Sequence, residues 1–303
     1  MNTSMYDYIK TIIPRERILF HEPMNQHTTF RVGGEAECFF AIQQEEELVK
    51  LIPYLNQIEQ DYFILGNGSN LLVGDKGYRG IVLKFDGPME QIRTDGTRIT
   101  AKAGAPLAKV AVAAKENGLT GLEFAAGIPG TIGGGVVMNA GAYDGEMKQV
   151  VEAVRVINRE GEITTLDNDT MEFGYRTSII KNRPYIVLEV VLRLAEGDPD
   201  QIGAKMEELA QLRRNKQPLE YASAGSTFKR PEGYYAGKLI MEAGMRGYRI
   251  GGAQVSNKHC GFIINTGRAT AADIKEVIEE VQERVKERFH VSLEPEVVFL
   301  GDF

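Results

Sequence analysis

Apolar and polar positions in the first part of the chain alternate between strand-length runs and helical periods. An apolar run over 36–42 has the length and composition of a strand. The segment 43–60 then carries apolar side chains at helical spacing, with three glutamates in its first turn, where the helix dipole favours negative charge. Further strands are predicted over 62–65 and 81–85. This pattern predicts a first α+β unit that ends near Asp86.

The middle of the chain is richer in strand patterns. Alternation around Asp95-Gly96 predicts a hairpin, because Asp-Gly readily adopts the positive φ angles of a type I′ turn. The predicted elements of this region are a hairpin over 91–103, a helix over 105–117, a second hairpin over 150–166 and a strand over 185–194. The second unit therefore ends near Ala195.

The last part of the chain is dominated by helical periods. The predicted elements are helices over 202–214, 236–243 and 271–289, with a strand over 261–265. The longest helix repeats apolar residues at i, i+3 and i+4, so that one face packs and the charged face is solvated. The pattern thus predicts three parts, at residues 1–86, 87–200 and 201–303.

Composition narrows the class of protein. The chain has 303 residues, is 43% hydrophobic and carries a formal net charge of −7, which disfavours a nucleic-acid surface. It contains neither a secretory h-region in its first thirty residues nor an apolar stretch approaching eighteen residues, so we expect a cytoplasmic protein without a membrane segment. Cys38 and Cys260 are expected to be buried thiols. The four histidines are spread without ligand spacing, so we expect no metal site.

Two glycine-rich stretches stand out as candidate sites for an anionic ligand. The longer, over 127–143, has glycine at 127, 130, 133, 134 and 135, and the shorter is Leu65-Gly-Asn-Gly-Ser-Asn-Leu-Leu72. Glycine lets backbone N–H groups approach a phosphate, although one such loop alone is more often a tight turn. Neither stretch matches the P-loop or Rossmann signature. Together they predict two clamps on one long ligand, most simply a dinucleotide held by another architecture.

Five motifs in order along the chain resemble the bacterial UDP-N-acetylenolpyruvoylglucosamine reductases. They are Ile64-Leu-Gly-Asn-Gly-Ser-Asn-Leu-Leu72, Gly127-Ile-Pro-Gly-Thr-Ile-Gly-Gly134, Glu172-Phe-Gly-Tyr-Arg-Thr-Ser178, Ala224-Gly-Ser-Thr-Phe-Lys-Arg-Pro231 and Leu293-Glu-Pro-Glu296. The resemblance implies an α+β fold. In it, a two-subdomain FAD-binding module of the vanillyl-alcohol-oxidase (PCMH) type, over about 30–195, precedes a C-terminal α+β substrate-binding domain.

The resemblance also implies tightly but non-covalently bound FAD. The two glycine loops would hold the diphosphate through backbone N–H groups while apolar side chains wall the flavin ring. The implied cofactor-binding residues are Gly66, Asn67, Gly68, Ser69, Asn70, Leu71, Gly127, Gly130, Thr131, Gly133, Gly134, Asn139 and Gly141.

The implied reaction is reduction of an enol ether with NADPH as co-substrate. Hydride passes from NADPH to the flavin, and from flavin N5 to C3 of the enolpyruvyl group of the UDP-sugar. The family pattern assigns stabilisation of the resulting enolate to Arg176 and Glu296, and protonation of C2 to Ser226. The neighbouring Glu294 is a rival to Glu296, which occupies the motif position ahead of an apolar run.

The family pattern further assigns the UDP-sugar to four residues. These are Tyr175, Arg213, Lys216 and Arg230, and a solvated basic face is the alternative for the cations, to which Lys229 also belongs. The chain resembles the branch without a tyrosine-bearing lid insertion, because 176–194 runs directly from motif to strand. Two other functions stay open at this point: another FAD oxidoreductase, such as a sugar or hydroxy-acid oxidase, and a non-enzymatic flavin- or UDP-sugar-binding protein.

Overall fold

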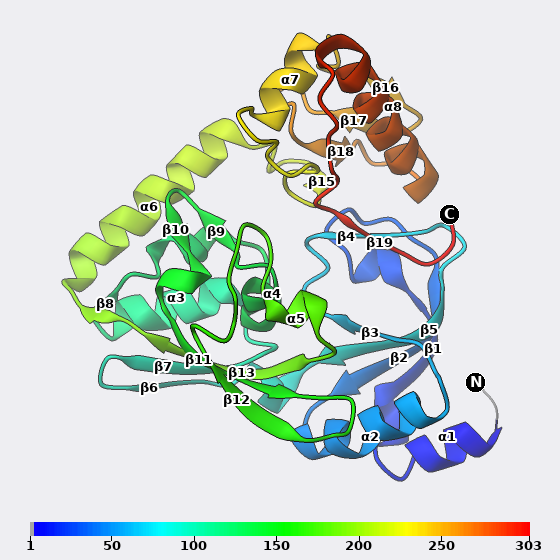
Figure 1. Cartoon of the computed structure of the whole chain (residues 1–303), viewed down its shortest axis with the longest axis vertical. Helices are drawn as coiled ribbons and strands as arrows, with labels where there is room; N and C mark the ends of the chain where they lie inside the picture. The colour runs from blue at the N-terminus through cyan, green and yellow to red at the C-terminus, as the bar shows by residue number, and fades with distance from the viewer. Residues whose placement is uncertain (1–2) are drawn as a thin grey trace. The chain divides into compact units, whose positions relative to one another are not determined.

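The computed structural model describes residues 3–303, which divide into two compact units (Figure 1). Unit 1 contains the chain up to Phe20 together with Cys38–Asn67 and Gly80–Leu212. Unit 2 contains His21–Glu37, Gly68–Arg79 and Arg213–Phe303. Two short N-terminal segments thus join the C-terminal third of the chain in unit 2. The division predicted at residues 86 and 200 stays a proposal.

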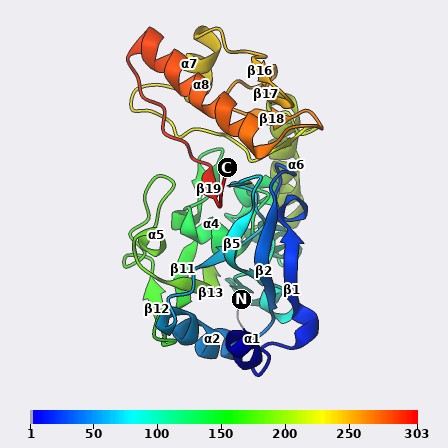
Figure 2. The same ribbon diagram turned by 90° about the vertical axis from the view of Figure 1, so that its right-hand side faces the viewer.

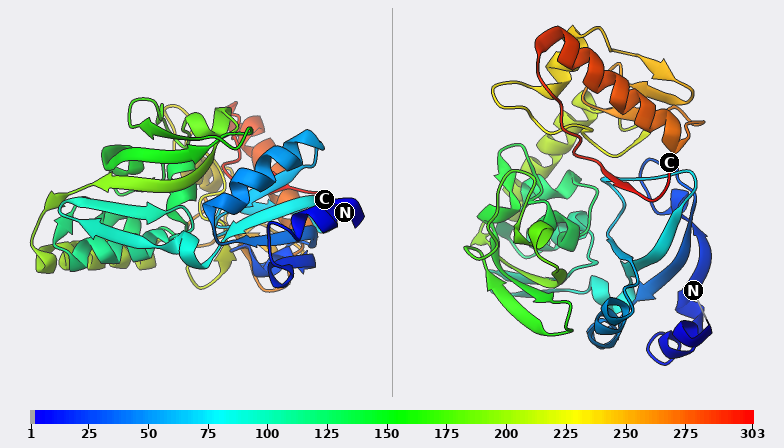
Figure 3. Two further views of the ribbon diagram at one scale, coloured as in Figure 1. Left: turned by 90° about the horizontal axis from the view of Figure 1, so that it is seen from below. Right: turned by 45° about the vertical axis from the view of Figure 1, so that its right-hand side comes forward.

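A four-stranded sheet with the order β1-β2-β5-β3 contains the first strands of the chain. These are β1 (Ile18–Pro23), β2 (Glu35–Ile42), β3 (Tyr62–Leu65) and β5 (Tyr78–Phe85), and β3 pairs in parallel with β5. Two helices, α1 (Thr3–Ile9) and α2 (Glu45–Gln57), belong to the same part of unit 1. Helix α2 lies beside this sheet (Figure 3) and buries Leu48, Leu51 and Leu55 completely. The predicted strand–helix–strand pattern is confirmed.

The rest of unit 1 is built on a five-stranded antiparallel sheet with the order β12-β11-β13-β7-β6. Its strands are β6 (Ile92–Asp95), β7 (Arg98–Lys102), β11 (Val151–Ile157), β12 (Ile163–Asp167) and β13 (Ile186–Arg193). The helices of this region are α3 (Leu107–Glu116), α4 (Ile132–Val137) and α5 (Ile179–Asn182). Two small antiparallel pairs complete it, namely β8 (Leu119–Thr120) with β14 (Ala195–Glu196) and β9 (Gly141–Ala142) with β10 (Gly145–Glu146). Both predicted hairpins and the alanine-rich helix are confirmed.

Three details of the middle region differ from the sequence prediction. The turn between β6 and β7 is Gly96-Thr97, and of these two only Gly96 has positive φ, so the turn is not of type I′, which requires positive φ at both positions. Thr97 explains the difference, because a β-branched residue resists positive φ. Helix α4 forms inside the stretch predicted as a glycine loop. Helix α5 occupies one turn of the run 176–194 that was expected to pass straight into a strand.

Unit 2 packs two helices on a four-stranded sheet with the order β15-β18-β17-β16. Its strands are β15 (Ala222–Ser223), β16 (Arg249–Ile250), β17 (Ala253–Val255) and β18 (Ile263–Asn265), and its helices are α7 (Ala236–Glu242) and α8 (Ala271–Phe289). Figure 2 shows α8 lying along this sheet, on which its apolar stripe is buried. Helix α6 (Pro199–Lys216) leads into the unit. The predicted helices and the predicted strand are confirmed.

Residues from the start of the chain complete unit 2. Strand β4 (Leu71–Val73) pairs in parallel with β19 (Val298–Leu300). Asp75 accepts hydrogen bonds of 2.8 Å from the backbone N–H groups of Ala271 and Ala272. These are the first two residues of α8, where orphan N–H groups and the helix dipole favour a carboxylate. The segment 68–79 is thereby fixed to the C-terminal region by both a ladder and a helix cap.

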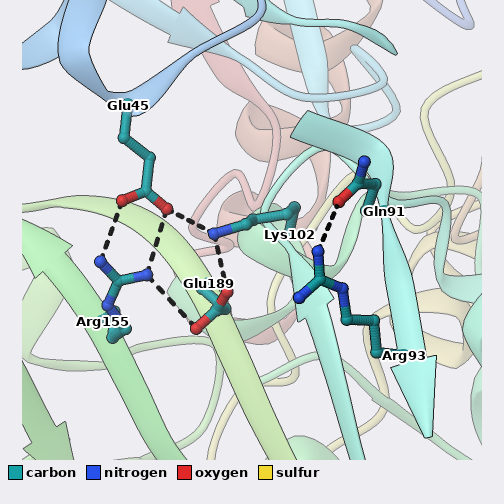
Figure 4. Close-up of polar contacts among 6 residues, drawn as sticks. All are labelled: Glu45, Gln91, Arg93, Lys102, Arg155 and Glu189. Carbon is teal, nitrogen blue, oxygen red and sulfur yellow. Dashed lines mark hydrogen bonds and ion pairs between the residues drawn. The ribbon is translucent and has the colours of Figure 1, made fainter. Parts of the chain in front are cut away.

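Four charged side chains form a half-buried network in unit 1 (Figure 4). Glu45, at the start of α2, lies 2.9 Å from the Arg155 guanidinium and also pairs with the Lys102 ammonium. Glu189 lies 2.7 Å from Lys102 and 3.3 Å from Arg155, which closes the ring of alternating charges. Because Lys102, Arg155 and Glu189 lie on β7, β11 and β13, the network joins α2 to the five-stranded sheet. Burial raises the pKa of the Glu45 carboxyl, but hydrogen bonds from Lys102 and Arg155 outweigh burial and leave the pKa below 4.5.

We expect Glu45 to make the stability of unit 1 depend on pH in the acid range. A carboxyl whose folded pKa is lowered binds fewer protons in the folded state, so its stabilisation is present above pH 4.5 and is lost as the pH falls through the folded pKa. Glu45→Gln is therefore expected to lower the Tm at pH 7, and the gap to the wild type should narrow below pH 4.5. Thermal unfolding followed by circular dichroism across this range measures the gap, with the exposed Glu46→Gln as control. A gap that is independent of pH would contradict the assignment.

Candidate functional site

The first glycine loop offers a row of available backbone donors. Strand β3 ends at Leu65, β4 begins at Leu71, and the chain passes from unit 1 to unit 2 between Asn67 and Gly68. Within residues 3–303, the N–H groups of residues 66–70 donate no hydrogen bond to protein. Successive free N–H groups in a glycine-containing turn are a known anion-binding arrangement. Binding of the diphosphate of a dinucleotide by this loop stays a prediction.

The two glycine-rich stretches contact each other within unit 1. The Asn67 side-chain amide donates to the Pro129 carbonyl at 3.2 Å. A Cβ at Gly66 would lie 2.9 Å from the Thr131 hydroxyl oxygen, so a side chain at this position would have to displace Thr131. The structure therefore brings together two motifs that lie about sixty residues apart in sequence.

Several glycines of the second stretch take part in hydrogen bonds and close contacts within the protein. Thr131 caps α4 by accepting a 3.2 Å hydrogen bond from Gly134 N–H. The N–H of Gly133 donates to the Ala103 carbonyl at 2.9 Å, and a Cβ at Gly133 would lie 2.9 Å from that same oxygen. Gly130 N–H likewise donates within the protein, to the Ile128 carbonyl. The donors of Gly130, Gly133 and Gly134 are thus engaged, so the first loop provides most of the available N–H groups.

Asn139 and Gly141 lie just after α4, in the segment that leads into the β9–β10 hairpin. Asn139 is 2% exposed, and its side chain makes three hydrogen bonds to protein, with Glu146, Gly174 and Lys148. Gly141 is needed for close approach, since a Cβ there would lie 2.6 Å from the Gly145 carbonyl oxygen. Contact of either residue with a flavin stays a prediction.

Arg176 lies in a tight turn of unit 1. Gly174 and Thr177 exchange two backbone hydrogen bonds, of 3.1 and 3.3 Å, which place Tyr175 and Arg176 between them. Arg176 has a φ of 55°, a left-handed conformation uncommon for residues other than glycine. Its guanidinium lies 5.3 Å from the centre of the exposed Tyr175 ring. Such strain clusters at functional sites.

In unit 2, Thr227 connects the segment that contains Ser226 to the segment that contains Glu296. Thr227 is completely buried, its N–H donates to the Gly261 carbonyl at 2.8 Å, and its hydroxyl accepts from Ile263 N–H at 3.1 Å. Its carbonyl accepts from Glu296 N–H at 2.8 Å. Ser226 therefore sits next to a fixed point, and its own side chain is exposed on a turn that begins at Gly225, with a φ of 75°.

Glu296 and its rival Glu294 differ in their surroundings. Glu296 is half-buried, and the carbonyl of the same residue accepts a 2.9 Å hydrogen bond from the Asn70 side chain in the first glycine loop. Glu294 has a side chain that is 68% exposed and forms an ion pair with Lys229. Glu296 is thus the less exposed residue of the pair, and Lys229 is engaged in an ion pair with Glu294.

The predicted substrate cations occupy the start of the C-terminal part of unit 2. Arg213 and Lys216 form the last turn of α6, and Lys216 is exposed. Arg230 belongs to the motif that contains Ser226, and its guanidinium lies 3.9 Å from the centre of the Tyr235 ring. Tyr175 belongs to unit 1, and it is the one predicted substrate residue outside unit 2.

Sequence reasoning missed Thr29, a residue beside the first loop. Its N–H donates to the Gly68 carbonyl at 3.2 Å. Its hydroxyl oxygen is buried and has no hydrogen-bond partner in the part of the chain that the structure describes. A buried hydroxyl without a partner is costly, which makes Thr29 a candidate ligand group. The sequence feature that could have identified Thr29 is its position in the segment Thr28-Thr-Phe-Arg-Val-Gly-Gly34, which ends in two glycines.

Three further features bear on the class of site. Among residues 3–303, no three His, Cys, Asp or Glu side chains are grouped so that they could hold a metal ion. None of the helices in this range combines the length and hydropathy required to span a bilayer. Cys38 and Cys260 are both buried, as predicted.

Two family models match the chain. The FAD binding domain matches residues 36–167, and the C-terminal domain of UDP-N-acetylenolpyruvoylglucosamine reductase matches residues 217–300. The UDP-N-acetylenolpyruvoylglucosamine reductase of Caldanaerobacter subterraneus subsp. tengcongensis is 51% identical over 298 residues, 98% of each protein. The enzyme of that name from Lachnoclostridium phytofermentans is 48% identical and covers 100% of this chain and 99% of its own length.

Solved structures agree with these matches. The crystal structure of UDP-N-acetylenolpyruvylglucosamine reductase from Thermus caldophilus has a TM-score of 0.80 and 36% identity, and covers 93% of this chain and 98% of its own. A glucose oxidase variant of Phl p 4, at 12% identity and a TM-score of 0.50, covers 65% of this chain and 44% of its own and shares the fold alone. The fold is the predicted one, an FAD-binding module of the PCMH type with a C-terminal α+β domain. The chain therefore belongs to the family of the UDP-N-acetylenolpyruvoylglucosamine reductases.

Proposed function

We propose that this protein is the cytoplasmic, FAD-dependent reductase that converts UDP-N-acetylenolpyruvoylglucosamine to UDP-N-acetylmuramate with NADPH, in the synthesis of peptidoglycan precursors. The observation that carries the proposal is the likeness to reductases of that name along 98% of the chain, which includes both the FAD-binding and the C-terminal domain. The turn that bears Arg176 and the pairing of the Ser226 and Glu296 segments support it further.

The first glycine loop and its neighbours would hold the FAD. The free N–H groups of 66–70 are suited to the diphosphate, and the buried hydroxyl of Thr29 provides a further polar group beside Gly68. When bound, the flavin would supply the redox chemistry, taking a hydride from NADPH and delivering one to C3 of the enolpyruvyl group. The protein has to bind the substrate, stabilise the charge that develops on it and provide a proton.

Arg176 and Glu296 are suited to the developing negative charge. Addition of hydride at C3 moves electron density toward the substrate carboxylate and creates an enolate. A guanidinium is permanently charged and can meet two carboxylate oxygens at once. A turn fixed by two backbone hydrogen bonds is a support that can hold it in place. Glu296 can contribute when a proton is shared between the two carboxyl groups.

Ser226 is suited to deliver the proton to C2. A serine hydroxyl is a weak acid, so it is useful only toward an acceptor of high proton affinity and only with accurate placement. An enolate is such an acceptor. Placement follows from Thr227, whose three hydrogen bonds fix the adjacent backbone while leaving the hydroxyl of Ser226 exposed.

The cations of unit 2 would bind the diphosphate of the UDP-sugar, and Lys216 is exposed in the last turn of α6. Lys216→Ala is expected to raise the KM for the UDP-substrate by roughly 10-fold to 150-fold, because a charge-assisted phosphate contact contributes about 1.5–3 kcal/mol. The flavin content should not change. Steady-state kinetics measure the effect, and Lys205→Ala, at an exposed ion pair on the same helix, is the control. An unchanged KM would mean that Lys216 does not bind the substrate and belongs to a solvated basic face.

The proposal as a whole is tested by consumption of NADPH. We expect steady oxidation of NADPH that depends on the enolpyruvyl substrate and yields UDP-N-acetylmuramate in equal amount. A sugar or hydroxy-acid oxidase would instead oxidise its substrate without NADPH. A flavin- or UDP-sugar-binding protein would bind one of the two ligands and consume no NADPH, and either result would overturn the proposal.

A further inference from the structure

The turn that carries Arg176 is tied to the end of α4 at two points. Near its start, the Gly174 carbonyl accepts a 3.0 Å hydrogen bond from the Asn139 side-chain amide. After its end, the hydroxyl of Ser178, which is 1% exposed, donates to the Val137 carbonyl at 2.9 Å. Both anchors lie in the segment 137–139 of unit 1, at the end of α4 and just after it.

Asn139 is fully engaged in holding this arrangement. Its two N–H donors go to the Gly174 carbonyl and to the Glu146 carboxylate, each at 3.0 Å. Its carbonyl oxygen accepts from Lys148 N–H at 2.9 Å. A side-chain amide has two N–H donors, so no side-chain donor is left for a ligand. The residue is 2% exposed, and loss of one partner would leave another buried group unsatisfied.

The conformation of Arg176 explains why such an anchor is needed. Its φ of 55° is sparsely populated for a residue with a side chain, and such a conformation persists only when its surroundings hold it. Glu172, at the entrance to the turn, also has positive φ, at 48°. Backbone hydrogen bonds between Gly174 and Thr177 close the turn but do not fix it to the rest of the unit.

We propose that Asn139 is a positioning residue for Arg176, which it aims by fixing the Gly174 carbonyl to the segment after α4. This inference rests on the proposed function, in which Arg176 stabilises the enolate. It assigns Asn139 a role through its side chain that is separate from the flavin contact implied by the family resemblance. A displacement of a catalytic group by about 1 Å costs roughly 10²-fold in rate.

Asn139→Asp is the sharpest test because it keeps the shape of the side chain. The variant retains an acceptor for Lys148 N–H, loses both donors, and places a carboxylate against Glu146 and the Gly174 carbonyl. We expect reoxidation of the reduced flavin by the enolpyruvyl substrate to slow about 10²-fold. The rate of flavin reduction by NADPH, measured per bound flavin, should stay within about twofold. Equal loss in both half-reactions would indicate general damage to unit 1 and overturn the proposal.

Two variants at Glu146 separate positioning from charge repulsion. Glu146→Gln keeps an oxygen acceptor for the Asn139 amide and is expected to behave like the wild type. Asn139→Asp combined with Glu146→Gln removes the facing carboxylate, so thermal stability should return toward that of the wild type. The substrate step should stay slow, since the bond to Gly174 is still missing. A substrate step as fast in the double variant as in the wild type would contradict the proposal. If Asn139→Asp alone fails to fold, the double variant is used for the test in its place.

Trypsin cleavage after Arg176 tests the anchor without any reaction. In the FAD-loaded protein without substrate, Asn139→Asp and the double variant are expected to be cut at this bond about tenfold faster than the wild type, as mapped by mass spectrometry, because cleavage follows local opening. An unchanged cleavage rate would overturn the anchoring. If the protein were not the proposed reductase, the wild type would give no substrate step, while the cleavage rates would still report on the anchor.

Discussion

Ser226→Ala is expected to leave the reduction of bound flavin by NADPH intact and to slow its reoxidation by the enolpyruvyl substrate. The expected loss is about 10²-fold to 10⁴-fold, the usual contribution of a positioned proton donor. The side chain is exposed on a turn, so its removal leaves no cavity, and the hydrogen bonds of Thr227 do not involve it. Rapid-mixing absorbance measurements of the two half-reactions give the two rates separately.

A matched control lies three residues upstream. Ser223→Ala, on β15, removes a hydroxyl from the same segment and is expected to keep both rates near those of the wild type. Impairment of both half-reactions to the same degree in Ser226→Ala would contradict the role of Ser226 as proton donor, because loss of a proton donor affects only the step that uses the substrate.

Glu47→Ala is expected to destabilise unit 1 by about 3–5 kcal/mol, the cost of removing one partner from a buried ion pair. The side chains of Glu47 and Arg17 are 6% and 15% exposed, and the two groups form a two-point contact. The Glu47 carboxylate also accepts from the backbone N–H groups of Gln43 and Gln44, at 2.9 and 3.3 Å. Its removal leaves the Arg17 guanidinium without its counter-charge in a largely buried site.

Denaturation by urea measures this loss, followed by far-UV circular dichroism because the chain contains no tryptophan. The control is Glu46→Ala, an exposed glutamate in the same turn, which should change the stability by no more than about 0.5 kcal/mol. Similar midpoints for the two variants would mean that the pair with Arg17 contributes little.

Elements with a strong local period could be predicted from the sequence. Helix α8 has the bounds that its apolar spacing predicts, and the hairpin around Glu160-Gly161 follows from alternation and a turn glycine with a φ of 82°. Helix α4 could not be predicted in this way. Its sequence, Ile132-Gly-Gly-Gly-Val-Val137, has low helix propensity, and the helix depends on the Thr131 cap and on close packing against Ala103.

Local sequence patterns also could not predict which distant segments pair with one another. The pairing of β4 with β19 joins residues more than two hundred positions apart, and unit 2 recruits two N-terminal segments without any change in periodicity. At the site, the motifs named Ser226 and Glu296 but gave no sign that Thr227 connects them. The available donors of the first loop, and the engaged ones of the second, likewise depend on partners that periodicity does not specify.

The central claim is that the chain binds FAD and passes electrons from NADPH to the enolpyruvyl substrate, and one measurement tests it most directly. The absorbance spectrum of the purified protein is followed without oxygen while NADPH and then UDP-N-acetylenolpyruvoylglucosamine are added. We predict a yellow protein that NADPH bleaches and that the enolpyruvyl substrate restores in a stoichiometric amount. A colourless protein that cannot be reconstituted with FAD, or a bleached protein that the substrate does not reoxidise, would contradict the account.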